Sequence, residues 1–346
     1  MITGKLMKSL VGVAALGALA LGLGGTTASA DTTLRVGSWL PPVHPIVKGM
    51  IDPWSKQVEE ATEGRVKVKV LKAKLGKPPA YFDIAKDGIA DVTYGVHGYT
   101  PGRFVLTQAA ELPFLADNAE ALSVAYWDVY ESMMAQANEH KGTKVLGIFT
   151  HGPGQIYNSK KAVTTADGAA NLKMRIGGGI VHQVATTLGM VPVQAPAPKV
   201  YELLSNGVAD GILFPKESPS FFKIDKVLKH GTFVKGGLYN TSFFLVMNPK
   251  KFAGLSPKDQ TALMNVSGHA FSVLAGKAWD EADRRGVDGM KAAGMQLIDA
   301  DDAMLSDLTK RLAHIEADWV KRAGEKGVDG TAILKALRAK VADYKM

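Results

Sequence analysis

Arg175 is the residue whose type and setting point most clearly to chemistry. It lies in an apolar segment at residues 172–176 and is followed by glycines at positions 177–179. A guanidinium is a planar fork that can hold a carboxylate through two parallel hydrogen bonds, and it keeps its charge at physiological pH. Backbone N–H groups of a glycine-rich turn that leads into a helix can also point at an anion. The pattern predicts a carboxylate site at Arg175 and Gly177.

A purely structural role for this segment is also compatible with its residues. Arg175 could pair with a neighbouring acid such as Asp167, or lie on the surface with its alkyl stem packed. The glycines could form a tight turn that requires positive φ. They make a poor dinucleotide fingerprint, because His182 stands where that motif requires its third glycine.

Local signatures of catalysis and of metal binding are missing from the sequence. The eight histidines never form an H-x-H or H-E-x-x-H pair, and the chain has no cysteine. The motif G-x-S-x-G and the P-loop are absent as well. Asp299, Asp301 and Asp302 resemble a cation cluster, but they lack EF-hand spacing and better fit the cap of a helix beginning near Ala303. We expect a binding protein and not an enzyme, with neither cofactor nor metal.

Composition and the N-terminal segment limit the class of protein. The 346 residues suffice for about two domains. With 46% hydrophobic and 21% charged residues, the chain resembles neither a disordered nor a polytopic membrane protein.

Lys5 and Lys8 precede an uncharged run at residues 9–25 and an A-S-A sequence at 28–30. These features predict a signal peptide at residues 1–30, cleaved near Ala30, and a periplasmic location. A permanent anchor would require about 20 apolar residues, and residues 10–23 fall short.

The formal net charge of +8 suggests an anionic partner. We do not expect nucleic acid. The protein is predicted to be exported, and the lysines at positions 223, 226, 229 and 235 lack an aromatic-interleaved binding motif.

The elements that must position Arg175 alternate between strands and helices. We expect strands at residues 34–36, 65–71, 90–94, 144–149, 172–176, 211–214 and 242–247. We expect helices at residues 53–61, 82–87, 119–137, 181–188 and 199–205, and a long helix after Ser256 as N-cap. Such alternation predicts an α/β fold with mostly parallel sheets. Ligands bind at the C-terminal edge of such sheets, where Arg175 would stand.

At this point the sequence resembles a known family, the periplasmic solute-binding proteins of TRAP transporters, of the C4-dicarboxylate type. Seven stretches carry the resemblance, in the family's order and over nearly the whole chain after residue 30. They are 34–45 (LRVGSWLPPVHP), 59–68 (EEATEGRVKV), 75–76 (LG), 86–95 (KDGIADVTYG), 111–115 (ELPFL), 171–176 (NLKMRI) and 200–211 (VYELLSNGVADG).

The resemblance implies a two-lobed α/β protein of the periplasmic binding protein fold, its lobes joined by two crossing strands and a long helix. It would capture one small organic acid between the lobes and deliver it to an ion-coupled permease with a small and a large membrane subunit. Arg175 matches the family's carboxylate-binding arginine. The crossings would fall near 151–157 and 238–241. Lobe I would comprise residues 31–152 and about 242–280, and lobe II residues 153–241 and about 281–346. We expect a monomer.

Two departures from the family pattern bear on the ligand. Many members have a second arginine where this chain has Gln155, and many have a ligand-binding asparagine where it has Phe214. Without a second buried cation, a second ligand carboxylate would be costly to accommodate. The phenyl ring adds apolar surface at about 25 cal/mol per Å². These departures favour a monocarboxylate with an apolar or aromatic body.

Five further residues could line the ligand site by the same sheet-edge argument, and each could equally belong to the core. They are Trp39, Tyr94, His97, Tyr239 and Phe243. Two other functions also remain open: an exported two-lobe enzyme acting on an organic acid, and a sensor subunit that reports ligand occupancy to a receptor.

Overall fold

The computed structural model of the chain describes residues 32–345. The predicted signal peptide lies outside these residues, so its cleavage stays a prediction. The described residues belong to one compact unit. Within the described part, no helix combines the length and apolar character needed to cross a membrane.

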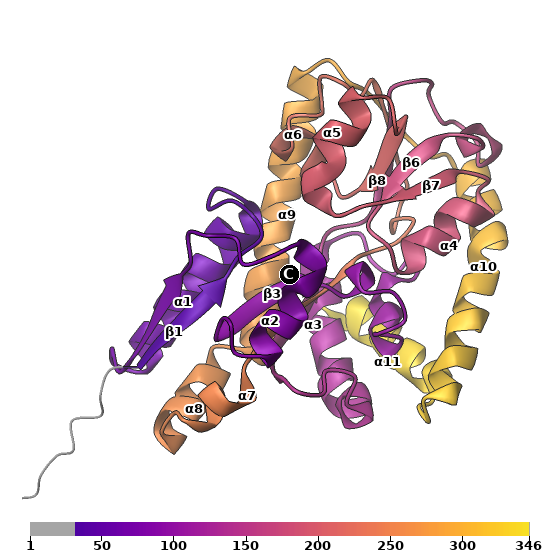
Figure 1. The fold of residues 1–346 in the computed structure, drawn as a ribbon. Helices are drawn as coiled ribbons and strands as arrows, with labels where there is room; N and C mark the ends of the chain where they lie inside the picture. Colours follow the sequence, from indigo (N-terminus) through magenta and orange to yellow (C-terminus); the bar gives the residue numbers. More distant parts are fainter. Residues whose placement is uncertain (1–31, 346) are drawn as a thin grey trace, which may run out of the picture. The chain divides into compact units, whose positions relative to one another are not determined.

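Two β-sheets form the framework of this unit (Figure 1). The first has the order β2-β1-β3-β10-β4 and the second the order β11-β9-β5-β8-β6-β7. The strands of the first sheet are β1 (Thr32–Gly37), β2 (Val66–Val70), β3 (Val92–Val96), β4 (Lys144–Thr150) and β10 (Ser242–Met247). Those of the second are β5 (Gln155–Asn158), β6 (Lys173–Ile176), β7 (Val191–Gln194), β8 (Gly211–Phe214), β9 (His230–Phe233) and β11 (Gln296–Asp299).

Helices cover these sheets, and the apolar residues that they bury recur at helical spacing along the sequence. In α1, for example, Trp54 and Val58 are fully buried and stand one turn apart. The helices are α1 (Asp52–Ala61), α2 (Tyr81–Lys86), α3 (Ala119–Val129), α4 (Ile180–Thr187), α5 (Val200–Ser205), α6 (Ser218–Phe221), α7 (Pro249–Ala253), α8 (Pro257–Asn265), α9 (Gly268–Ala292), α10 (Asp302–Glu325) and α11 (Gly330–Asp343).

All seven predicted strands are present, and the α/β prediction is confirmed. The four strands that the sequence pattern did not indicate are β5, β7, β9 and β11, each of four residues. The expectation of mostly parallel sheets needs correction. In the first sheet β10 runs antiparallel to both β3 and β4, and in the second β5 runs antiparallel to both β8 and β9. Both sheets are therefore mixed, because β5 and β10 follow the connections between the sheets.

Two short segments carry the chain between the sheets, as the resemblance implied. The chain leaves the first sheet after Thr150 and enters the second at Gln155, and it returns between β9 and Ser242. The segments hydrogen-bond to each other: Gly154 N donates to Tyr239 O at 2.8 Å, and Leu238 N donates to Gly154 O at 3.0 Å. The two connecting segments are therefore held to each other by backbone hydrogen bonds.

The long helix after Ser256 is two helices, which corrects the prediction. Ser256 does cap the first, its Oγ accepting from Asp259 N at 3.1 Å, but the helix ends at Asn265. Gly268 has φ of +55°, and a Cβ there would lie 2.7 Å from the Trp127 ring. Ser267 Oγ accepts a hydrogen bond from Trp54 Nε1. Packing against these two tryptophans fixes a break that continuous apolar spacing does not reveal.

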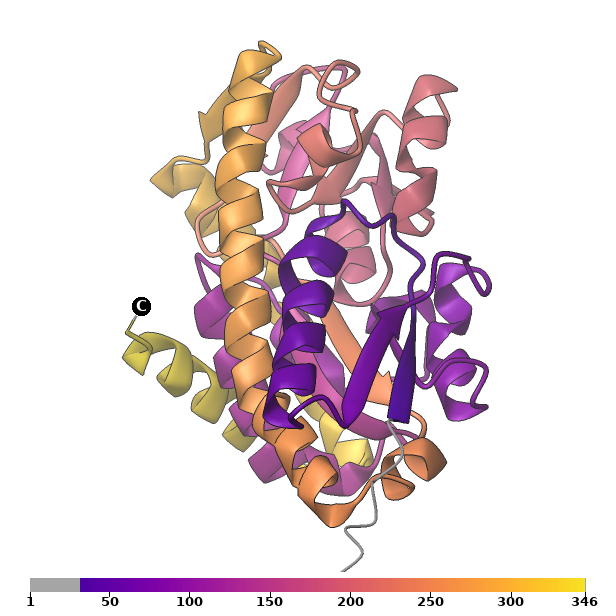
Figure 2. The same cartoon turned by 90° about the vertical axis from the view of Figure 1, so that its left-hand side faces the viewer.

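Helix α9 packs against parts of the chain that belong to both sheets. It contacts α3 and β4 of the first sheet's layer and also α6, which follows β8 of the second. Figures 1 and 2 show it running between these regions. At Gly286 the approach to the segment before α6 is very close, because a Cβ would lie 2.2 Å from Lys216 O. The predicted third connection between the sheets is therefore α9.

The two C-terminal helices pack against different parts of the fold. Helix α10 packs on α4, whereas α11 packs on α3, beside the first sheet. Asp301 caps α10 by accepting from Met304 N at 2.8 Å. This is the capping function expected for the aspartate cluster near residue 300. Among the described residues, no three His, Asp or Glu side chains gather in a way that could hold a metal ion.

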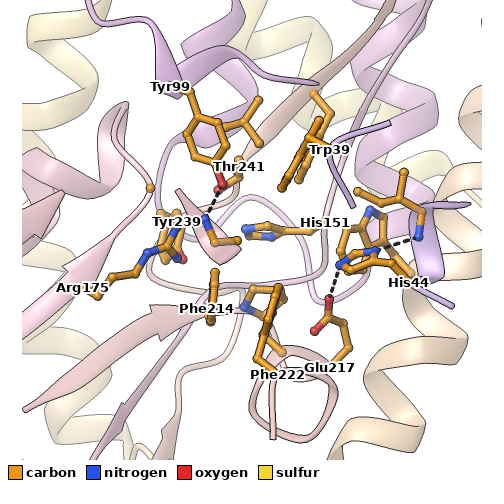
Figure 3. A pocket seen from close by; sticks show the side chains of 18 residues that line it. Trp39, His44, Tyr99, His151, Arg175, Phe214, Glu217, Phe222, Tyr239 and Thr241 are labelled. Atoms are coloured by element: carbon orange, nitrogen blue, oxygen red, sulfur yellow. Dashed lines mark hydrogen bonds and ion pairs between the residues drawn. The ribbon is translucent and has the colours of Figure 1, made fainter. Parts of the chain in front are cut away.

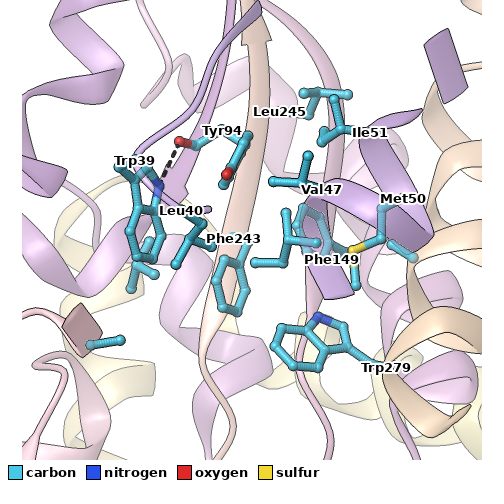
Figure 4. Packing of buried hydrophobic residues seen from close by; sticks show 14 of the residues in the cluster. Trp39, Leu40, Val47, Met50, Ile51, Tyr94, Phe149, Phe243, Leu245 and Trp279 are labelled. Carbon is cyan, nitrogen blue, oxygen red and sulfur yellow. Dashed lines mark hydrogen bonds between the residues drawn. The ribbon is translucent and has the colours of Figure 1, made fainter. Parts of the chain in front are cut away.

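The core beside the connecting segments is aromatic (Figure 4). Phe149 of β4 and Phe243 of β10 stack with their ring centroids 5.0 Å apart. The ring of Trp279, in α9, has its centroid 6.0 Å from that of Phe243. These rings form a rigid wall next to the point where the two sheets are connected.

Candidate functional site

A cavity is lined by residues from both sheets and from the connecting segments (Figure 3). The free volume between the side chains that line it is small, about 40 Å³. The lining residues are Trp39, His44, Ile46, Val96, Tyr99, His151, Arg175, Gly177, Ala197, Phe214, Pro215, Glu217, Ser218, Phe222, Tyr239, Thr241, Phe243 and Trp279. All of them belong to the described part of the chain, and Arg175 is the one Arg or Lys among them.

Arg175 lies in β6, between β7 and β8, and only 1% of it is exposed. Its Nε and Nη2 both donate to Ala195 O, at 2.9 and 2.6 Å. One carbonyl oxygen thus orients the guanidinium through two of its five N–H groups. Burial lowers the pKa of Arg175, but a guanidinium keeps its proton in proteins.

No carboxylate of residues 32–345 pairs with Arg175. The acid considered as a partner from sequence, Asp167, instead binds Arg311, with Nη1 and Oδ1 2.6 Å apart. The groups around the guanidinium are aromatic: it lies 4.3 Å from the centroid of the Phe214 ring, and the side chains of Tyr99 and Tyr239 also face it. A buried cation without an anion is costly, so this arrangement favours an anionic guest.

The helix N-terminus after the glycines is already occupied, which corrects the expectation that its amides face the ligand. Ile180 N donates to Glu111 Oε2 at 3.1 Å. Glu111 also accepts from Ser242 Oγ at 2.6 Å. Burial raises the pKa of Glu111 to about 7. Gly177 does line the cavity, but the acceptor at the start of α4 is the chain's own carboxyl group.

Aromatic rings form the walls of the cavity. Trp39 and Tyr99 meet edge to face at 5.8 Å, while Phe214 and Phe222 stack at 5.7 Å with 12° between their planes. Tyr99 is held in place because its hydroxyl accepts from Ala197 N at 2.9 Å. These fixed rings suit a flat apolar guest.

A second polar group lies at the side of the cavity away from Arg175 (Figure 3). His44 Nε2 is 3.8 Å from Glu217 Oε1, and His44 Nδ1 accepts from Ile46 N at 3.1 Å. Burial lowers the pKa of His44 to about 3 and raises that of Glu217 to about 8. At neutral pH the two side chains are therefore mostly uncharged neighbours and not an ion pair.

Six of the nine predicted site residues line the cavity together: Trp39, Arg175, Gly177, Phe214, Tyr239 and Phe243. The other three do not. Gln155 accepts from Val234 N and donates to Val234 O, so it braces β5. Tyr94 is hydrogen-bonded to Ser38 in the core, and His97 lies between Ser242 and His140.

Sequence reasoning missed several lining residues: His44, Tyr99, His151, Glu217, Phe222, Thr241 and Trp279. His44 lies within a stretch that carried the family resemblance, and Tyr99 follows the predicted strand at 90–94; these were the available signals. Glu217 follows the predicted strand at 211–214, whereas Trp279 has no local signal, because α9 brings it to the cavity.

Comparisons with known proteins identify the class. Residues 36–322 match the family described as bacterial extracellular solute-binding protein, family 7. A TRAP periplasmic solute-binding protein from Bordetella bronchiseptica, solved with bound (R)- and (S)-mandelate, is 41% identical with a TM-score of 0.88. The match covers 90% of this chain and 99% of that one.

Two further proteins are similar. A TRAP solute-binding protein from Rhodoferax ferrireducens, in complex with copurified benzoate, is 29% identical with a TM-score of 0.85, covering 90% of this chain and 98% of that one. The protein named outer membrane transporter protein TsaT, from Comamonas testosteroni, is 31% identical over 313 residues, which are 90% of this chain and 92% of that protein.

This chain therefore belongs to the bacterial extracellular solute-binding protein family 7. It is a two-lobed TRAP solute-binding protein, a class of receptors that bind small organic acids and work with membrane permease components. Its relatives act outside the cytoplasm, and they are receptors, not enzymes. The resemblance read from the seven sequence stretches is confirmed.

Proposed function

We propose that this chain captures an aromatic monocarboxylate in the cavity beside Arg175. The observation that carries the proposal is a buried guanidinium that has no carboxylate partner among residues 32–345 and lies 4.3 Å from the Phe214 ring. The ligand carboxylate pairs with N–H groups of Arg175 that do not bond to Ala195 O, and its ring lies between the aromatic walls. Binding of mandelate and benzoate by similar proteins supports this ligand class.

The opposite side of the cavity supports one carboxylate over two. A C4-dicarboxylate would place its second anionic group at this side, where no lysine or second arginine lines the described cavity. A buried charge without a partner strongly disfavours such a complex. Succinate and malate are therefore poor ligands.

The lobes that close on the ligand are residues 31–152 with 242–280, and residues 153–241 with 281–346. The contact of α11 with α3 adds a C-terminal support to the first lobe. The exported protein, cleaved near Ala30, works as a periplasmic monomer that delivers its ligand to a permease with one small and one large membrane subunit. Closure follows because the ligand contacts residues from both sheets and so binds the closed form better.

Thermal-shift and calorimetric titration with organic acids test the proposal. Benzoate and mandelate should raise the melting temperature, whereas succinate and malate should leave it unchanged at the same concentration. Saturable binding of succinate together with no response to any aromatic acid would contradict the proposal. Size-exclusion chromatography of the mature protein checks the monomer, and N-terminal sequencing of the exported protein checks the cleavage site.

A further inference from the structure

One carboxyl oxygen of Glu217, Oε2, is buried in the cavity wall without a hydrogen-bond partner in the described chain. Only 3% of the residue is exposed. Buried polar side chains nearly always have a partner, so an unsatisfied carboxyl oxygen beside a cavity requires an explanation. The missing partner fits best on the guest.

The backbone holds Glu217 firmly in place. Its N–H donates to Asp283 Oδ1 of α9 at 2.8 Å. A Cβ on Gly286 would lie 2.5 Å from Glu217 Cα, so α9 is pressed against this segment. The backbone position from which the Glu217 side chain extends is therefore fixed by the fold before any ligand arrives.

His44 supplies a donor beside this carboxyl group. Because Nδ1 accepts from Ile46 N, the proton of the neutral imidazole sits on Nε2. The distance of 3.8 Å from Nε2 to Glu217 Oε1 is too long for a direct hydrogen bond. The rings of Phe221 and Trp279, with centroids 4.5 and 6.2 Å from that of His44, keep the imidazole in position.

A hydroxyl group satisfies both side chains at once, since it can accept from His44 Nε2–H and donate to Glu217. A carboxylate at this end would be a second buried negative charge, and the described cavity lining has no lysine or second arginine to balance it. An ammonium group would suit Glu217 but would face the N–H of His44, which is also a donor. We infer that Glu217 and His44 recognise a hydroxyl group on the ligand, at the end away from the carboxylate held by Arg175. This inference rests on the proposed function and narrows the ligand to a hydroxylated aromatic acid.

Calorimetric titration of the purified protein with matched pairs of acids tests this inference. The pairs are benzoate with 3- and 4-hydroxybenzoate, and phenylacetate with 3- and 4-hydroxyphenylacetate; 4-(aminomethyl)benzoate provides a cationic substituent. At least one hydroxylated acid should bind about 10-fold or more tightly than its parent, because the parent leaves both protein groups unpaired. Glu217→Leu should bring that ratio close to one, whereas Glu217→Gln, which keeps an acceptor and a donor, should retain part of it.

Arg175→Ala is the matched control, because it should weaken parent and hydroxylated acids by similar factors and preserve their ratio. Equal affinity of parent and hydroxylated acids for the unmodified protein would overturn this inference and leave the proposed function standing. So would a Glu217→Leu protein that loses both affinities equally, or tightest binding of the cationic acid. If neither parent nor hydroxylated acids bind, the proposed function fails, and the inference falls with it.

Discussion

The guanidinium of Arg175 lies 4.3 Å from the ring centroid of Phe214, on the neighbouring strand of the second sheet. The pair combines a fixed cation with a fixed apolar face. Both side chains are almost completely buried, so their interaction is only weakly screened by water. A guest that is anionic at one end and flat beyond it complements both residues.

Removing the Arg175 guanidinium should abolish most of the ligand affinity. Truncating one member of a desolvated charge pair typically costs about 2–5 kcal/mol, so Arg175→Ala should weaken benzoate binding by tens to thousands of times in calorimetry. Arg175→Lys should also bind poorly, because an ammonium group lacks the planar fork. Unchanged affinity in the alanine variant would show that the carboxylate binds elsewhere.

Replacing the Phe214 ring should reduce the affinity for aromatic acids. Phe214→Asn removes one apolar face, and we expect benzoate to bind about 10-fold more weakly, corresponding to about 1.4 kcal/mol. Phe214→Leu keeps apolar volume without a π face and should give an intermediate affinity. Fluorescence or calorimetric titration distinguishes the three proteins. Equal benzoate affinity in all of them would exclude a contact between the ligand and this ring.

The ligand-free protein should lose stability as the pH rises from about 6.5 to 8. Burial raises the pKa of Glu111 and Asp283 to about 7 and that of Glu217 to about 8. The folded state therefore binds more protons than the unfolded state above about pH 4.5, and the free energy of unfolding falls until each carboxyl group has ionised. Burial lowers the pKa of His44 to about 3 and that of His151 to about 4. Their opposite effect, which the lowered pKa values of His140 and His97 share, is half complete at about pH 6.5 and nearly complete by about pH 7.5, because histidines of the unfolded state titrate near 6.5.

Urea denaturation between about pH 6.5 and 8.5 measures this dependence. Glu217→Gln removes one of the three titrating groups, so its unfolding free energy should fall less steeply with pH than that of the unmodified protein. A free energy of unfolding that rises across this interval would mean that the buried carboxyl groups are not protonated in the folded state.

The close approach at Gly286 should make this position intolerant of a methyl group. A Cβ would lie 2.2 Å from Lys216 O, so Gly286→Ala must push α9 away from the segment that carries Glu217. We expect a loss of about 1–3 kcal/mol in the free energy of unfolding. Gly324→Ala in α10 is the matched control, because a Cβ there has open space and should stabilise its helix by about 0.5–1 kcal/mol. Equal stability of the two variants in urea would contradict this packing.

The family, the α/β class, the connections between the sheets and the position of Arg175 could all be predicted from sequence. They depend on local periodicity and on short motifs, which neighbouring residues determine. The departure at Phe214 likewise indicated an aromatic guest from residue type alone.

Only the tertiary structure decided which side chains meet in the cavity. The same sheet-edge argument placed Tyr94, His97 and Trp39 at the ligand site, yet the side chains of Tyr94 and His97 are packed and hydrogen-bonded in the core. Glu111 accepts a hydrogen bond from Ile180 N at the start of α4, although it lies 69 residues earlier in the chain. Helix α9 fixes Glu217 near His44. Such contacts depend on how distant helices and strands pack, and a periodic pattern along the chain carries no information about its partner across the fold.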